Sequence, residues 1–347
     1  MKRTNAKAGN AFANMGERKM SLKVCLVGCG GMAVGGHGPA FQKIARENSW
    51  IRLAACCDVD AHRAEEFRKT FGFEKCYTDM HEMLRIEKPD AVSLVVPVHL
   101  TEKMSIQVME MGIPVILEKP PGMIREQTLR MMEVAARTGT IHQVAFNRRY
   151  MPMVQRFQEW RQGCQPHLWQ YDFFRSCRKD ADFSTTSIHA IDTVRFLAGQ
   201  DYETVEIEYL PNPAGKEYVP SILLSARFRD GQRAKITFVP ASGMSAERCI
   251  MHGANETITG NFPYHGAGSV DGNGSIVLTR NNQVVAAETA RRDEEDFVSN
   301  GFYGENLHFL ECVEKGIQPA GDIASGLQAV EIADHIRQRK TVFKITE

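Results

Sequence analysis

The chain contains 347 residues, more than one ordinary hydrophobic core supports, which indicates two domains. Its 42 basic and 42 acidic side chains balance, so no overall charge favours nucleic acid or an anionic membrane surface as a partner. No apolar run approaches the roughly 20 residues that span a bilayer, so no transmembrane helix is expected.

Residues 1–20 are polar and basic and lack the apolar stretch of a secretory signal, so we expect a flexible tail and a cytoplasmic protein. The nine cysteines are scattered, and none falls in a Cys-x-x-Cys motif. Reduced, packed thiols are therefore expected rather than disulfides or a zinc site, and no metal ion is expected.

Residues 22–146 alternate between short apolar runs and helix-like segments. Strands this continuously apolar are covered on both faces, and the alternation predicts a parallel sheet with right-handed helical crossovers. Asp79 is a typical residue for the start of a helix, and Gly112 for the end of one. The expected strands span residues 22–27, 51–57, 76–77, 91–96, 114–118 and 141–146, and the helices 39–47, 61–70, 81–87, 101–112 and 125–138. The pattern predicts a doubly wound α/β domain over residues 21–147.

A glycine-rich loop, VGCGGMA, connects the first expected strand to the first helix. Its spacing is Gly28-x-Gly30-x-x-Ala33, in the strand–loop–helix context that dinucleotide binding requires. Gly28 permits a tight turn, and Gly30 lets the backbone approach a pyrophosphate at the positive end of the helix dipole. Ala33 is small enough for close helix–strand packing, and Gly31 and Met32 complete the expected contact loop.

Asp58 follows the second expected strand, slightly farther from the loop than the usual ~20 residues. The additional residues GGHG at 35–38 account for the distance. A carboxylate there can accept hydrogen bonds from both ribose hydroxyls of an adenosine and would repel a 2′-phosphate, so NAD is the expected cofactor. Arg63, nearby in sequence, keeps NADP as the minor alternative.

Lys119 follows the fifth expected strand, in the segment VILEKPPG. The carboxyl edge of an open α/β sheet is where ligands bind. Pro120 disfavours a helical backbone at Lys119 and Pro121 fixes the next φ angle, so the ammonium is aimed across the crevice. This placement favours a functional lysine over an ordinary surface lysine.

Five motifs occur together with this glycine loop: EKP (118–120), GIPVIL (112–117), FNRRYMP (146–152), TTSIHAIDTVRFLAG (185–199) and FYGENLHFLECVEKG (302–316). In this combination the chain from Ser21 onward resembles the Gfo/Idh/MocA family of oxidoreductases, which includes glucose–fructose oxidoreductase and inositol dehydrogenase. The resemblance implies an N-terminal NAD(P)-binding Rossmann domain and a C-terminal α+β domain, over residues 148–347, with a large, mostly antiparallel sheet. In the family this sheet forms the sugar-facing wall of the site and often the oligomer interface, so a homodimer or homotetramer is expected.

The sequence after Tyr150 changes to strand-like runs with few helices, which suits one antiparallel sheet. RDGQR (229–233) predicts one hairpin, and the pair Asn281-Asn282 another. The other expected elements are strands at 167–174, 205–210, 221–228 and 234–239 and helices at 152–162, 305–314 and 323–338.

One more helix, SIHAIDTVRFLAG (187–199), interrupts these strands. His189 and Asp192 are three residues apart and therefore on one helix face. A histidine beside a carboxylate is oriented and more basic, as a general base must be, but the same spacing fits a structural pair. The resemblance favours the base, because family dehydrogenases have their catalytic histidine at this position. Thr185 stands where inositol-dehydrogenase-like members have an aspartate, so the proton relay is expected to differ, with Asp192 or Lys119 in support.

Together these features predict an NAD-dependent oxidoreductase that oxidises a secondary alcohol of a sugar, cyclitol or glycoside by hydride transfer. The expected catalytic set is His189 as base, Lys119 on the same oxygen, and Asp192. The expected cofactor contacts outside the glycine loop are Asp58, Arg63, Pro97, Glu118, Lys119 and Asn147. The expected substrate contacts are Arg148, Tyr150, Arg175, Asp182, Thr185 and Tyr303. Two alternatives stay open: a redox-neutral enzyme that cleaves glycosides through transient sugar oxidation, and a non-catalytic dinucleotide or sugar sensor.

Overall fold

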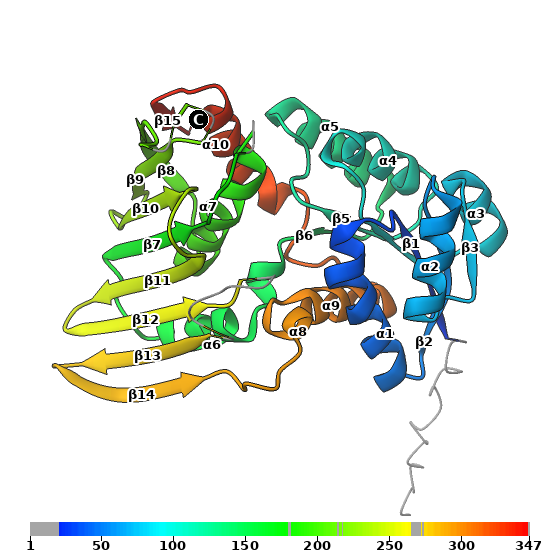
Figure 1. Cartoon of the computed structure of the whole chain (residues 1–347), viewed down its shortest axis with the longest axis horizontal. Coiled ribbons are helices and arrows are strands. Elements are labelled where there is room, and N and C mark those ends of the chain that lie inside the picture. The colour runs from blue at the N-terminus through cyan, green and yellow to red at the C-terminus, as the bar shows by residue number, and fades with distance from the viewer. Residues whose placement is uncertain are drawn as a thin grey trace, which may run out of the picture.

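Two sheets organise the chain, one in each half, with helices between them (Figure 1). The structure, a computed structural model, describes residues 21–179, 182–213, 215–216, 218–264, 272 and 274–345. The tail expected at residues 1–20 lies outside the described residues.

The sheet of the N-terminal half has six strands in the order β3-β2-β1-β4-β5-β6, and every neighbouring pair is parallel. Its strands are Leu22–Val27 (β1), Ile51–Cys57 (β2), Lys75–Tyr77 (β3), Ala91–Leu94 (β4), Val115–Glu118 (β5) and His142–Ala145 (β6). Its helices are Gly38–Glu47 (α1), Ala61–Phe71 (α2), Met80–Glu87 (α3), Val98–Glu110 (α4) and Arg125–Thr138 (α5). The doubly wound domain is confirmed. The strand order reverses between β1 and β4, which is where such sheets bind ligands, beyond the carboxyl ends of the strands.

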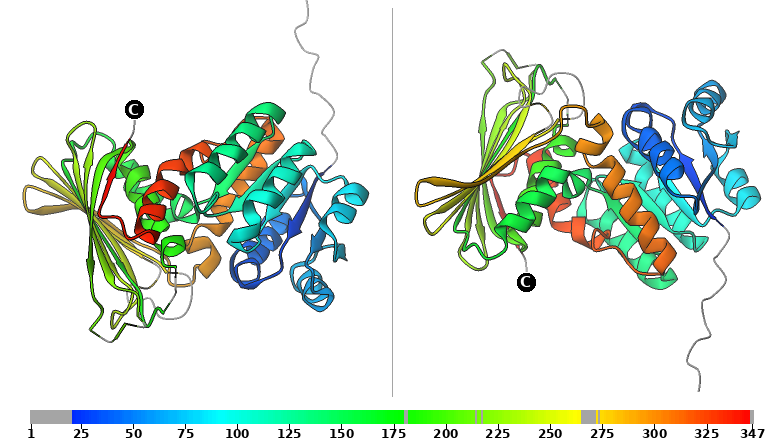
Figure 2. Two further views of the ribbon diagram at one scale, coloured as in Figure 1. Left: turned by 90° about the horizontal axis from the view of Figure 1, so that it is seen from above. Right: turned by 90° about the horizontal axis from the view of Figure 1, so that it is seen from below.

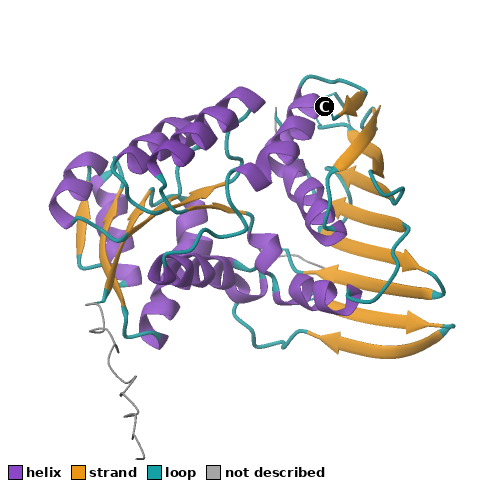
Figure 3. Cartoon of the chain, turned by 180° about the vertical axis from the view of Figure 1, so that it is seen from behind, coloured by secondary structure: helices purple, strands orange, loops and turns teal. Residues whose placement is uncertain are grey.

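Alternate residues along the central strand β1 pack on opposite faces of this sheet. Cys25 and Val27 of β1 share a buried cluster with side chains of α3, α4 and α5, whereas Val24 and Leu26 pack with α1 and α2. Figure 3 shows helices on both faces of the six-stranded sheet. The predicted cap Asp79 starts α3, where its side chain accepts a hydrogen bond from the backbone amide of Glu82.

The sheet of the C-terminal half has nine strands in the order β14-β13-β12-β11-β7-β10-β9-β8-β15. Its strands are Leu168–Phe174 (β7), Tyr202–Leu210 (β8), Ser221–Phe228 (β9), Arg233–Val239 (β10), Ala246–Gly253 (β11), Glu256–Phe262 (β12), Ser275–Arg280 (β13), Gln283–Thr289 (β14) and Val342–Lys344 (β15). Its pairs are antiparallel except for β7 with β10, in the part of the sheet that the structure describes. Both predicted hairpins form, as β9–β10 and β13–β14. A third hairpin, β11–β12, was not predicted.

Helices cover one face of the nine-stranded sheet and leave its other face without a helix in the described chain (Figure 2). The remaining helical segments are Asn147–Tyr150 (η2), Pro152–Arg161 (α6), Ser184–Ala198 (α7), Asp296–Ser299 (α8), Phe302–Lys315 (α9), Ala324–Gly326 (η3) and Leu327–Arg337 (α10). Helix α9 returns to the N-terminal half, where Phe309 and Leu310 join the cluster of α1, α2 and β1. The two halves are therefore joined by a packed core as well as by the chain at residue 147.

All nine cysteines are free thiols. No three His, Cys, Asp or Glu side chains among the described residues form a set that could hold a metal ion. None of the described helices combines the length and the apolar character that crossing a bilayer requires.

Candidate active site

The two glycines predicted to hold a dinucleotide differ in their surroundings. Gly28 has φ +95°, and a Cβ there would lie 2.0 Å from the carbonyl oxygen of Val95, so only glycine fits. A Cβ on Gly30 would meet no atom within 4 Å. Gly30 and Gly31 instead line an open cavity of about 670 Å³ that Arg63 also borders. The backbone is thus bare where a pyrophosphate has to approach, which fits the predicted dinucleotide.

Asp58 lies at the end of β2, beside this loop. Its carboxylate accepts hydrogen bonds from the backbone amides of Cys29 and Asp60, each at 2.9 Å, and from Arg63 Nη2, also at 2.9 Å. Burial raises the pKa of this carboxyl, but these three donors together lower it below its usual value. The predicted acid and the predicted arginine are therefore joined in one ion pair beside the glycine loop.

The residues after the glycine loop, Ala33–His37 (η1), form a π-helical turn, which accommodates the additional residues noted in the sequence. The turn brings His37 into the protein interior, where its Nε2 lies 3.0 Å from Oε1 of Glu118. Its Nδ1 contacts the side-chain amide of Asn306, and the ring of Phe302 packs edge-on at 5.4 Å. Sequence reasoning missed His37, although the GGHG segment that contains it was noticed.

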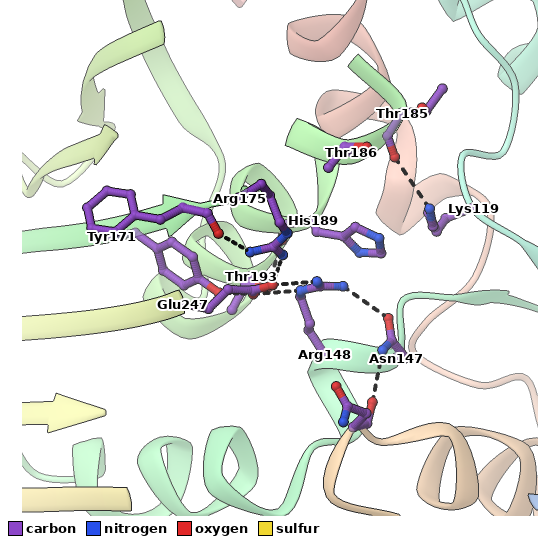
Figure 4. Close-up of polar contacts among 12 residues, drawn as sticks. Lys119, Asn147, Arg148, Tyr171, Arg175, Thr185, Thr186, His189, Thr193 and Glu247 are labelled. Carbon is purple, nitrogen blue, oxygen red and sulfur yellow. Dashed lines mark hydrogen bonds and ion pairs between the residues drawn. The ribbon is translucent and has the colours of Figure 1, made fainter. Parts of the chain in front are cut away.

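Lys119 lies at the carboxyl end of β5, as predicted, and follows Glu118. Its Nζ donates a hydrogen bond to the backbone carbonyl of Thr185 at 3.4 Å, across the junction between the two halves (Figure 4). Burial lowers the pKa of Lys119; Glu118 opposes this shift, whereas Arg148 and Arg178 add to it. The peptide bond between Lys119 and Pro120 is cis.

His189 and Asp192 lie on the same helix, α7, but no hydrogen bond between them is found in the described chain. Asp192 binds Arg149, whose Nε and Nη2 lie 2.8 and 2.5 Å from its two carboxylate oxygens. The Nδ1 atom of His189 is buried and has no hydrogen-bond partner among the described residues. The expected gain in basicity is wrong. Burial lowers the pKa of His189 well below its usual value, and the positive charges of Arg148, Lys119 and Arg175 lower it further.

A buried carboxylate that the sequence did not reveal, Glu247 on β11, organises two of the predicted substrate residues. Arg148 binds it through Nε at 2.8 Å and Nη2 at 2.5 Å, and Arg175 donates to one of the same oxygens. The hydroxyl of Tyr171 donates a further hydrogen bond at 2.9 Å. The guanidinium of Arg175 also lies between two aromatic rings, 3.7 Å from that of Phe173 and 4.0 Å from that of Tyr264. Two cations are thereby fixed beside His189 (Figure 4).

A cavity of about 210 Å³ lies at the junction of the two halves and brings together part of the predicted site, including Lys119 and His189. The predicted residues that line it are Met32, Glu118, Lys119, Asn147, Arg148, Arg175 and His189. The side-chain amide of Asn147 donates a hydrogen bond to the backbone carbonyl of Asn300 at 2.8 Å, which fixes its orientation. Of the two threonines at the start of α7, Thr185 offers its carbonyl to Lys119, and Thr186 lines the cavity.

Several predicted substrate contacts do not line this cavity. The hydroxyl of Tyr303 donates to Glu47 on α1 at 2.7 Å, and the carboxylate of Asp182 accepts a hydrogen bond from the amide of Ser184 at 2.9 Å. The ring of Tyr150 packs 5.4 Å from that of His308. We therefore leave these three out of the proposed site. Pro97, a predicted cofactor contact, lies between β4 and α4 and immediately precedes the helix.

Comparison with known families covers nearly the whole described chain. Residues 22–146 match the family model "Oxidoreductase family, NAD-binding Rossmann fold", and residues 136–341 match "Oxidoreductase family, C-terminal alpha/beta domain". The chain belongs to the Gfo/Idh/MocA oxidoreductase family. As a member, it is an oxidoreductase with an NAD(P)-binding Rossmann domain, and the predicted α/β fold is confirmed in both halves.

Relatives within the Gfo/Idh/MocA family are distant. The chain is 28% identical over 138 residues to D-glucoside 3-dehydrogenase of Escherichia coli (strain K12), covering 40% of this chain and 38% of that protein. It is 26% identical over 293 residues to scyllo-inositol 2-dehydrogenase (NAD(+)) of Bacillus subtilis (strain 168), covering 77% and 80%. Matches to the first curated relatives span only 38% to 58% of those proteins.

Solved structures share the fold of this Gfo/Idh/MocA protein. Levoglucosan dehydrogenase in complex with NADH superposes with a TM-score of 0.78 at 17% identity, covering 94% of this chain and 100% of that one. At this identity the likeness shows the fold alone.

Proposed function

We propose that the protein is an NAD-dependent dehydrogenase that oxidises a secondary alcohol of a sugar, cyclitol or glycoside. The observation that carries the proposal is that Lys119, from the Rossmann half, and His189, from the sheet half, line the same cavity (Figure 4). Bound NAD would supply the hydride acceptor. The names of the relatives, which are glucoside and inositol dehydrogenases, support the substrate class.

His189 takes the hydroxyl proton in this proposal. Because its pKa is lowered well below the usual value, the imidazole is neutral at pH 7 and its lone pair is available, while the same shift makes it a weaker base than an ordinary histidine. No carboxylate among the described residues orients it, so its position depends on α7 and on the packing around it. Asp192 has no direct part in this step because Arg149 holds both of its oxygens.

Lys119 binds the same oxygen and stabilises the negative charge that develops there. Lys119 is half-buried, and its ammonium donates to one carbonyl oxygen, that of Thr185, at the long distance of 3.4 Å. Such a fixed cation is already in place when negative charge develops on the substrate oxygen. Glu118 keeps its ionised form because burial, which raises its pKa, is outweighed by the hydrogen bond from His37 and by Lys119.

NAD is favoured over NADP by Asp58. Its carboxylate lies beside the glycine loop, where a 2′-phosphate would meet its negative charge. Arg63 could bind a 2′-phosphate, but it is bound to Asp58 at 2.9 Å. Arg63 therefore offers no spare positive charge to a 2′-phosphate.

The test is NADH formation by the purified protein with a panel of free sugars, inositols and glycosides. Oxidation of at least one member is expected. If instead NAD stays bound through purification and a glycoside loses its aglycone without net NADH, the redox-neutral alternative is correct. If NAD binds and neither reaction occurs with any compound of the panel, the dehydrogenase proposal is contradicted and the sensor alternative is supported.

We further propose that the chain forms a homodimer or homotetramer through the helix-free face of the nine-stranded sheet, as the family resemblance implies (Figure 2). Light scattering on the eluted protein tests this, and a monomeric mass would contradict it.

A further inference from the structure

His37 is a buried histidine that the proposed reaction does not use. Its side chain lies outside the cavity that holds Lys119 and His189, so it does not meet the substrate there. Its Nε2 atom, however, lies 3.0 Å from Oε1 of Glu118, and Glu118 lines that cavity. The direct route from His37 to the reacting groups therefore runs through Glu118.

The turn η1 is built so that the His37 ring points into the protein. Gly36 has no room for a side chain, because a Cβ there would lie 2.7 Å from the ring of Phe302, which packs edge-on against His37. Single π-helical turns are rare and occur frequently at functional sites. In this chain the turn replaces a regular start of the helix and brings His37 into contact with Glu118.

The hydrogen-bond partners of His37 assign its proton to Nε2. The amide nitrogen of Asn306 donates to the backbone carbonyl of Phe302 at 2.7 Å and lies 3.1 Å from Nδ1 of His37, whereas the amide oxygen is 3.3 Å away. A carbonyl oxygen can only accept, so the contact with Phe302 orients the amide and leaves its second N–H for Nδ1. Nδ1 then accepts a hydrogen bond, and Nε2 donates its hydrogen to Glu118.

Glu118 is held at both of its carboxylate oxygens. Oε1 accepts the hydrogen bond from His37, and Oε2 accepts one from the backbone amide of Lys119 at 3.1 Å. Burial raises the pKa of this carboxyl, but the hydrogen bond from His37 and the charge of Lys119 help to lower it below its usual value. Without His37, the backbone amide of the next residue is the one hydrogen-bond partner that Glu118 retains in the described chain.

The charge on Glu118 matters for Lys119. Among the described residues that line the cavity, Glu118 alone carries a carboxylate. Burial lowers the pKa of Lys119, and the charge of Glu118 is the main cause that opposes this shift. An ammonium that stabilises developing negative charge has to keep its proton during the reaction. An ionised Glu118 therefore supports the role proposed for Lys119.

We propose that His37 is a positioning residue of the reaction, which holds the carboxylate of Glu118 ionised and oriented beside Lys119 so that Lys119 acts as a fixed cation. The inference rests on the proposed function and adds to it a residue that lies outside the cavity.

Two variants of His37 separate hydrogen bonding from packing. His37→Gln keeps an N–H donor near the place of Nε2, whereas His37→Leu fills similar space without a donor. At saturating NAD and with a substrate from the panel, kcat should fall about tenfold or more in His37→Leu but less than about threefold in His37→Gln, because only the first loses a hydrogen bond to a charged group. The exposed control His81→Leu should leave kcat unchanged.

Thermal unfolding of the same proteins shows whether a loss of kcat is general damage. Equal kcat in His37→Leu and His37→Gln, or a loss that only follows the unfolding temperature, overturns the inference. If His37→Leu does not fold, His37→Asn takes its place, since its shorter amide does not reach Glu118. Equal kcat in His37→Asn and His37→Gln then overturns the inference.

A double-mutant cycle with Glu118→Gln tests the route of the effect. In the Glu118→Gln protein, His37→Leu should lower kcat by less than about threefold, because the charge that His37 supports is already absent. Losses that multiply in the double variant would overturn the route through Glu118.

If no compound of the panel is oxidised, the proposed function fails, and crystal structures of His37→Gln and His37→Leu decide whether His37 positions Glu118. The carboxylate of Glu118 should keep its orientation in His37→Gln and change it in His37→Leu. The same orientation in both variants overturns the inference.

Discussion

Arg149 and Asp192 form a bidentate ion pair in the interior of the C-terminal half, with Nε to Oδ2 at 2.8 Å and Nη2 to Oδ1 at 2.5 Å. Both side chains are almost fully buried, and Arg149 also donates to the hydroxyl of Ser325 at 3.0 Å. The pair therefore joins η2 to α7 and to the segment before α10. Since α7 carries His189, this ion pair fixes the helix on which the proposed base lies.

Replacement of Asp192 by asparagine should lower the free energy of unfolding by about 3–5 kcal/mol, because one charge of a buried pair is left without its partner. Urea denaturation measures the change. The exposed pair of Arg137 and Glu110 is the control, and Glu110→Gln should cost less than about 1 kcal/mol. A stable Asp192→Asn protein with a displaced pH profile of turnover would instead return Asp192 to the catalytic set.

The glycine loop offers a matched pair of substitutions. Gly28→Ala should destabilise the fold and abolish NAD binding, because its φ is +95° and the new Cβ would collide with the carbonyl of Val95. Gly30→Ala should fold normally, since nothing lies within 4 Å of its Cβ, but should bind NAD at least about tenfold more weakly. Thermal unfolding and NAD titration on both proteins check this. Normal NAD affinity in Gly30→Ala would mean that the dinucleotide does not approach this loop.

Glu305 gives a prediction about pH and stability. It is completely buried, and its two carboxyl oxygens have no hydrogen-bond partner among the described residues. Burial, and then the nearby charge of Glu118, raise its pKa well above the usual value. In the unfolded chain this group ionises near pH 4.3. Its stabilising contribution is therefore complete below about pH 4 and is lost as pH rises toward its pKa in the fold.

Glu305→Gln cannot ionise and should escape that loss. The variant should be more stable than the unmodified protein at pH 7, by up to about 1.4 kcal/mol for each pH unit above the unfolded pKa, and the difference should vanish near pH 4. Urea unfolding at a series of pH values measures it. A stability difference that does not change with pH would show that Glu305 is ionised in the fold.

How far the sequence predicts this molecule depends on whether a feature is local. The strands of the Rossmann half are recognisable because β1, β4 and β5 are apolar on both faces, and the capping role of Asp79 is decided within one turn. Strand β11 was missed because its sequence contains Glu247, a charged residue that is unusual inside a core. In the fold this side chain is fully buried.

Partners that are distant in sequence were not predictable. Arg148 and Arg149 are adjacent, yet they bind different carboxylates, Glu247 and Asp192. The spacing of His189 and Asp192 correctly placed them on one helix, but it could not show that an arginine 43 residues away would take the carboxylate. His37 likewise meets Glu118 because a π-helical turn rotates it inward, which no local pattern indicated.

Cofactor choice is testable at Asp58. Asp58→Ser removes the charge that would repel a 2′-phosphate and leaves Arg63 without this partner, so the ratio of kcat/KM for NAD to that for NADP should fall about tenfold or more. Arg63→Ala should raise the same ratio, because Asp58 then keeps its charge without compensation. Initial rates with both cofactors measure the ratio. An unchanged ratio in both variants would place the adenosine ribose away from this pair.

Turnover by Lys119→Ala and His189→Ala, measured beside their affinity for NAD, tests most directly whether these two side chains converge on the reacting alcohol. With a substrate from the panel, each variant should lose about a hundredfold or more in kcat while still binding NAD, and the exposed control Lys103→Ala should behave as the unmodified protein does. Near-normal kcat in either variant would contradict the proposed roles.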